Sequence, residues 1–76
     1  MVSPNPVVDL MRLSDLDKYS RADRVVIYNA SGKGIGTYRI DNNSMEIDVS
    51  NLIPGLYMYS LEGNTGVLAS GKFIRQ

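Results

Sequence analysis

The sequence predicts an all-β domain built as an antiparallel sandwich. Apolar residues recur with a period of two in several short runs. Clusters of glycine, asparagine, serine and proline separate these runs at spacings of about 8–12 residues. About six to seven short strands are therefore expected, packed as an Ig-like antiparallel β-sandwich. A chain of 76 residues has room for a single domain with one core.

The N-terminal half contains three candidate strands, at residues 7–13, 24–28 and 35–40. The second is a continuous run rich in β-branched side chains, which predicts a strand buried on both faces. Residues 14–23 show no clear periodicity. We interpret them as a loop, and a single helical turn capped by Ser14 or Asp15 is the alternative.

The C-terminal half contains three more candidate strands, at residues 45–49, 56–62 and 67–74. In the first, Met45, Ile47 and Val49 share one face, and two carboxylates occupy the other. These carboxylates lack the ordered spacing of a calcium loop, so we interpret them as a solvated acidic face. The other two strands alternate in the same way, and each is expected to have an inner and an outer face.

Turn residues separate the predicted strands. The segments 29–34, 41–44 and 63–66 are rich in asparagine, serine and glycine, which favour turns and tolerate positive φ. Pro54 and Gly55 suit the two central positions of a type II turn, where proline presets φ and glycine accepts a positive value. Each segment is therefore predicted to connect two strands.

Tyr57 and Tyr59 lie on one face of the predicted strand 56–62. The favoured interpretation is that both rings pack in the core or along its rim, with their hydroxyl groups near water. An exposed pair that serves as a recognition patch is the alternative.

Each end of the sequence has a structural and a functional interpretation. In Ser3-Pro4-Asn5-Pro6, each proline fixes its own φ and extends the residue before it. The segment is therefore a stiff entry to the domain, or it marks the boundary with a preceding domain or linker. The final segment, 71–76, carries two cations. It predicts either an edge strand blunted by charge or a strand offered to a receptor groove by β-augmentation.

The composition argues against several classes of function. Eight basic residues balance eight acidic ones, so the chain lacks the positive field with which a nucleic-acid-binding protein neutralises phosphates. Histidine and cysteine are both absent, which removes the usual proton shuttle and the commonest nitrogen and sulfur ligands of metals. We therefore expect no enzymatic activity, no cofactor and no nucleic-acid partner.

Four motifs occur in order along the chain, and together they resemble those of a known family. They are S-P-N-P-V-x-D-L at 3–10, V-x-I-Y-N-x-x-G-K at 25–33, I-D-V-S-N-L-x-P-G-L-Y at 47–57 and G-K-F-I-R at 71–75. In these motifs the chain is similar to the C-terminal sorting domains of the type IX (Por) secretion system of the Bacteroidota. The resemblance covers residues 1–76 and implies the last domain of a larger exported protein.

The resemblance implies a non-catalytic address on an Ig-like sandwich. The type IX translocon would recognise the domain in the periplasm and direct the upstream cargo across the outer membrane. A sortase would usually cut before the domain and attach the cargo to the cell surface. The expected recognition residues combine the family's signature positions with one neighbouring aromatic residue: Pro4, Asn5, Pro6, Gly55, Tyr57, Lys72 and Phe73.

Two other interpretations of the same sequence stay open. The domain could be a docking module retained on a component of the secretion machinery, or a generic Ig-like adhesion or sugar-binding module. We also expect weak homodimerisation, because an uncovered sandwich edge invites pairing with a second copy.

Overall fold

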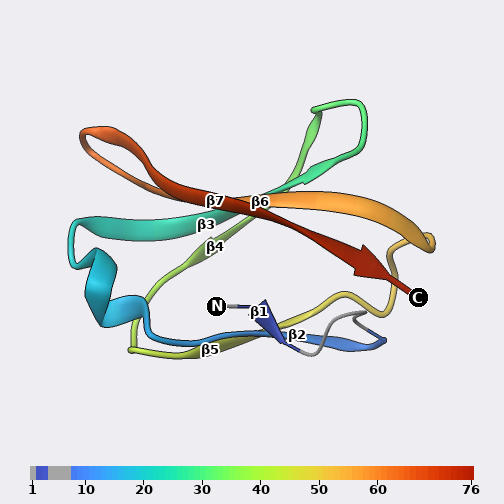
Figure 1. Ribbon diagram of the computed structural model, residues 1–76, viewed down its shortest axis with the longest axis horizontal. Helices are drawn as coiled ribbons and strands as arrows, with labels where there is room; N and C mark the ends of the chain where they lie inside the picture. Colours follow the sequence, from blue (N-terminus) through green and yellow to red (C-terminus); the bar gives the residue numbers. More distant parts are fainter. Residues whose placement is uncertain (1, 4–7) are drawn as a thin grey trace.

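The computed structural model describes residues 2–3 and 8–76, and it confirms an all-β sandwich (Figure 1). The described elements are seven strands and one short 3-10 helix. In chain order they are β1 (Val2–Ser3), β2 (Leu10–Leu13), η1 (Leu16–Tyr19), β3 (Ala22–Asn29), β4 (Gly34–Arg39), β5 (Met45–Asp48), β6 (Gly55–Gly63) and β7 (Gly66–Arg75).

The described strands form two antiparallel sheets that lie face to face (Figure 1). One sheet has the order β1-β2-β5, and the other has the order β4-β3-β6-β7. In immunoglobulin constant domains the fourth strand lies in the same sheet as the first two. Here β4 pairs with β3 instead, with Tyr38 opposite Val25. The second sheet is therefore the wider one, and β4 and β7 are its edges.

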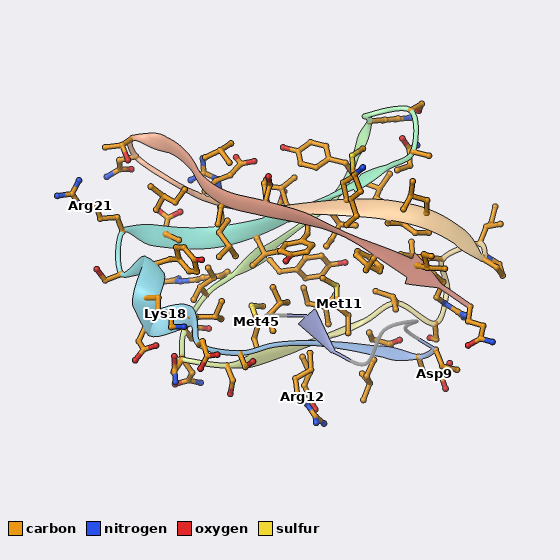
Figure 2. All side chains as sticks on the ribbon, in the orientation of Figure 1. Asp9, Met11, Arg12, Lys18, Arg21 and Met45 are labelled. Atoms are coloured by element: carbon orange, nitrogen blue, oxygen red, sulfur yellow. The ribbon has the colours of Figure 1, made fainter. Side chains whose placement is uncertain are left out.

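The core lies between the two sheets. Figure 2 shows the alternation on β2, where Met11 points between the sheets and Arg12 points away from them. Burying an apolar side chain of this kind stabilises the fold by roughly 1.5–3 kcal/mol. The buried core residues are Met11, Leu13, Leu16, Val25, Ile27, Ile47, Val49, Tyr57, Leu61 and Phe73.

β3 does not have the double burial that its composition predicts. Val25 and Ile27 are buried, whereas Val26 and Tyr28 are only half-buried. A sandwich has two layers, so each sheet meets the core on one face only. The β-branched residues of β3 therefore reflect strand preference and not burial on both sides, and that prediction is wrong.

Residues 14–23 contain η1, so the favoured prediction of a loop is wrong for this segment. Asn43 caps the helix from a distant part of the chain. Its backbone carbonyl accepts from the N–H of Leu16 at 2.9 Å, and its Oδ1 accepts from the N–H of Asp17 at 2.8 Å. Asp15 stands at the N-cap position with φ 59°, but its side chain makes no capping bond.

The turns at 29–34 and 63–66 are confirmed as hairpin connections. In the first, Asn29 Oδ1 accepts from the backbone N–H groups of Ser31 and Lys33 at 3.1 and 3.0 Å. Gly32 has φ 90°, a value that costs little only for glycine.

The type II turn predicted at Pro54 and Gly55 is not formed. Gly55 has φ 156°, far from the roughly +80° that the third position of such a turn requires. The hydrogen-bonded turn lies earlier, where the N–H of Leu52 donates to the carbonyl of Val49 at 3.0 Å.

The strand boundaries also differ from those predicted, most clearly at β3, which spans eight residues where five were expected, and at the first and last candidates. The first candidate, 7–13, is shorter, because β2 begins at Leu10 after a bend at residues 8–9, and Val7 lies outside the described residues. The last candidate is longer than predicted, since β7 has ten residues.

Candidate functional site

Tyr57 lies near the start of β6, with its ring inside the sandwich. Its side chain is 8% exposed, and its hydroxyl donates to the carbonyl of Ile53 at 2.5 Å. A tyrosine that bonds back to the backbone a few residues upstream is the tyrosine corner of immunoglobulin-type sandwiches. The Pro54-Gly55 segment between the two bonded groups is therefore part of this corner.

Phe73 on β7 lies directly opposite Tyr57 in the ladder between β6 and β7. The two rings stack with their centroids 5.6 Å apart and their planes at 21°. Phe73 is 1% exposed. Two of the predicted recognition residues therefore pack against each other in the core, where they hold the last strand in place.

Tyr59, two residues beyond Tyr57, is half-buried on the same face. Burial raises the pKa of its hydroxyl, and the neighbouring Tyr19 raises it further. A Cβ added at Gly71 would lie 2.5 Å from this hydroxyl, so the tyrosine ring covers that glycine. The interpretation that Tyr57 and Tyr59 pack in the core and along its rim is confirmed, and the alternative of an exposed pair is wrong.

Gly55 and Lys72 differ from the two aromatic residues, because both are exposed. Gly55 lies opposite Arg75 in the ladder between β6 and β7, and Lys72 lies opposite Met58. The structure therefore brings these two predicted residues onto neighbouring strands. Pro4, Asn5 and Pro6 lie outside the described residues.

A second feature of this sheet is an apolar patch on its outer face, formed by Leu56 and Ile74 beside Lys72. Leu56 and Ile74 are direct partners in the ladder, with exposed fractions of 45% and 52%. Met58 and Lys72 are partners two residues further along, so all four side chains share one face. The alternation in the sequence assigns these residues to one face, but nothing in it indicated a joint surface.

An open groove lies next to this apolar patch. It has a volume of about 380 Å³, and Tyr28, Met58, Ser70 and Lys72 are among the residues that line it. Small residues on β6 and β7 leave this space, since Ser60 and Ser70 are paired across the ladder. The outer face of the sheet is therefore hollowed beside its apolar end.

The opposite end of the outer face is polar and tightly bonded. The carboxylate of Glu62 accepts from the hydroxyls of Ser60 and Tyr28 at 2.5 and 2.8 Å, and Arg24 lies 3.6 Å away. Hydrogen bonds from Ser60 and then Tyr28, with a smaller effect of Arg24, hold the pKa of Glu62 below its ordinary value. The polar groups of this cluster bond to one another, so the cluster has a structural role.

Arg75, at the end of β7, joins the last strand to the connection between β5 and β6. Its Nε donates to the carbonyl of Val49 at 2.9 Å, and its Nη2 donates to the carbonyl of Ser50 at 3.0 Å. Ser50 also lowers the pKa of Asp48 through side-chain and backbone hydrogen bonds, and Arg75 adds an electrostatic contribution. In the sequence, Arg75 is only one of the two cations of the final segment, and no local pattern predicts this link.

Metal-binding clusters and membrane-spanning helices are both missing from the described residues. No group of three or more histidine, cysteine, aspartate or glutamate side chains within them is placed to hold a metal ion. In the same part of the chain, no helix is both long and apolar enough to cross a membrane. The described surface has an exposed strand with a cation, an apolar patch and a groove.

Comparison with known proteins adds one result. The family model described as the secretion system C-terminal sorting domain matches residues 1–76. No curated protein and no solved structure matches the chain.

Proposed function

Because this chain belongs to the family of secretion system C-terminal sorting domains, we propose that it is a non-catalytic address read by the type IX translocon. The family makes the chain a secretion sorting signal whose cargo is exported to the cell surface or the medium. The finer steps are passage of an upstream cargo from the periplasm through the translocon, and cleavage by an outer-membrane sortase that attaches the cargo to the surface.

The observation that carries this proposal is the extent of the family match. It spans all 76 residues, so no part of this sequence is left over for a separate catalytic module. The composition agrees, since a domain without histidine or cysteine lacks the side chains that most often carry catalysis near neutral pH.

The predicted recognition residues divide into two roles in this proposal. Gly55 and Lys72 are exposed and would contact the receptor directly. Tyr57 and Phe73 are positioning residues, because their stacked rings keep β6 and β7 in register beneath the contact surface. Pro4, Asn5 and Pro6 would mark the boundary with the cargo.

A fusion experiment tests the proposal. Residues 1–76 are joined to a reporter that carries its own signal peptide, in a host with a type IX system. We expect the reporter at the cell surface or in the medium, and in the periplasm of a host that lacks the translocon. A reporter that stays periplasmic in the complete host, although the domain is folded, would show that the chain is not an address.

Two matched variants sharpen the test. Lys72→Ala removes an exposed cation on β7, and Lys33→Ala removes one from the turn between β3 and β4. Both variants should fold, and only Lys72→Ala should reduce export. Mass spectrometry of the native parent protein separates a cleaved address from a retained docking module, because only the address is lost on maturation.

A further inference from the structure

The outer edge of β7 is the longest open strand edge in the described part of the chain. β7 pairs with β6 on one side, and no described strand pairs with its other side (Figure 1). It has ten residues, whereas β4 at the opposite edge has six. In the smaller sheet, the edge strands β1 and β5 have two and four residues.

This edge carries few of the devices that normally protect a sheet from pairing. Proteins blunt edges with short strands, bulges, prolines and charged side chains. Over residues 69–75 the ladder with β6 runs without a register shift and without proline. Of the two charged residues in that stretch, Lys72 is exposed and Arg75 is half-buried. The backbone N–H and C=O groups on the unpaired edge of β7 are therefore available to another strand.

The side chains beside this edge have a definite pattern. Lys72 and Ile74 are two residues apart and share the outer face of β7. Leu56 extends the apolar surface next to Ile74, and Met58 lies next to Lys72 at the groove. A strand laid along β7 would therefore meet a cation at one position and an apolar pair two residues further on.

The charge of this edge favours an acidic partner. Lys72 and Arg75 both belong to β7, and the sequence has no acidic residue from Gly63 to Gln76. Lys72 takes part in no ion pair with a described residue. Arg75 donates to backbone oxygens and also interacts electrostatically with Asp48, so Lys72 is the cation that this edge leaves uncompensated. A second copy would instead bring like charges together, which destabilises cross-strand pairing.

We propose that β7 binds an extended segment of a partner protein by β-augmentation, with a carboxylate beside Lys72 and an apolar side chain beside Ile74. Backbone hydrogen bonds along the edge would supply affinity, and these two side chains would supply specificity. The inference rests on the proposed function, because the partner segment would belong to the machinery that reads the address.

Binding of designed peptides to the full 76-residue chain tests the inference. The probe is a capped peptide of alternating threonine and valine in which one face carries an aspartate and, two residues later, a leucine. NMR should show saturable amide shifts confined to residues 69–75 and the adjacent part of β6. The β7 amides should exchange more slowly in the complex, and affinity should fall as salt is added.

Variants of the chain and of the peptide provide the controls. Lys72→Glu should weaken binding about five-fold, the range of a reversed surface charge pair. Ile74→Thr should weaken it too, whereas Lys33→Glu and Leu10→Thr, which change exposed residues elsewhere, should not. A peptide with lysine in place of aspartate should bind less well, and one N-methylated on the amides that face β7 should not bind.

Three results would overturn the inference. These are equal binding of the lysine and aspartate peptides, shifts confined to other strands, or self-association of the chain that blocks the edge and excludes the peptide. The fusion assay keeps this outcome separate from the proposed function. If the reporter is exported but the aspartate peptide does not bind, the inference is wrong and the proposed function stands. If the peptide binds but the reporter is not exported, the proposed function is wrong and the binding edge stands.

Discussion

The ring of Phe73 stacks on the ring of Tyr57, and the hydroxyl of Tyr57 reaches back to the carbonyl of Ile53. One tyrosine therefore ties the last strand to the loop that precedes β6. The pair supports the outer surface without reaching it, because both side chains are buried while their neighbours Lys72 and Ile74 are exposed. Five predictions follow this division between support and surface.

The hydroxyl of Tyr57 should stabilise the domain separately from its ring. Tyr57→Phe keeps the stack on Phe73 but leaves the carbonyl of Ile53 without this donor, so the free energy of unfolding should fall by about 1–2 kcal/mol. Urea denaturation measures the change. Tyr38→Phe, which alters a tyrosine that is 36% exposed, is the matched control and should change stability by less than about 0.5 kcal/mol. Equal effects of the two substitutions would show that the hydrogen bond from Tyr57 to Ile53 does not stabilise the domain.

Phe73 should be essential for folding. Phe73→Ala leaves a cavity beside Tyr57 and should cost about 3–5 kcal/mol, much of the stability available to so small a domain. Circular dichroism and urea denaturation would show partial or complete loss of structure. Ile74→Ala, at the neighbouring exposed position, should fold normally. A folded Phe73→Ala variant of unchanged stability would rule out its positioning role.

Arg75 should hold the end of β7 in place. Arg75→Gln removes the bonds to the carbonyls of Val49 and Ser50, and we expect a loss of about 1–2 kcal/mol in the free energy of unfolding. Hydrogen exchange should increase at the end of β7 more than elsewhere. The control is Arg39→Gln, at a side chain that is 85% exposed, for which no comparable change is expected.

Glu62 and Asp48 should make stability depend on pH in the acid range. The pKa of each is lower in the folded chain than its ordinary value of 4.5 or 3.8. Each therefore stabilises the fold above that ordinary value, and the contribution is lost as the pH falls through the lowered folded pKa. Urea denaturation between about pH 6 and pH 2 should show this decline, and it should be smaller for Glu62→Gln. An NMR titration that places the pKa of Glu62 at or above 4.5 would refute this account.

Self-association should be weak and should respond to salt. The bare edge of β7 allows two copies to pair, but the cations of the two strands repel one another. Light scattering at increasing protein concentration should show a small rise in mass, and added salt should enlarge it by screening the repulsion. A mass that stays monomeric at all concentrations would exclude this contact.

Local patterns in the sequence predict much of this fold. Alternation of apolar residues gives the faces of β5, of β6 and of β7 from Ala69 onward correctly, because side chains point to opposite sides of a strand with a period of two. It fails at the start of β7, where a register shift places Val67 opposite Glu62 and Ala69 opposite Leu61. The hairpin turns follow from asparagine and glycine for a similar reason, since these residues favour the local backbone geometry that a turn requires. Tyr57 also belongs to a motif whose packing in the core the sequence favours.

Contacts between distant segments account for what the sequence alone leaves open. The cap that Asn43 provides for η1 joins residues 26 positions apart, and the bonds of Arg75 to Val49 and Ser50 span similar separations. The pairing of β3 with β6, and hence the identity of the open edges, depends on how whole strands pack against one core. Propensity and periodicity describe each strand singly, whereas the exposed edge of β7 is set by the order in which all the strands of the sheet pair.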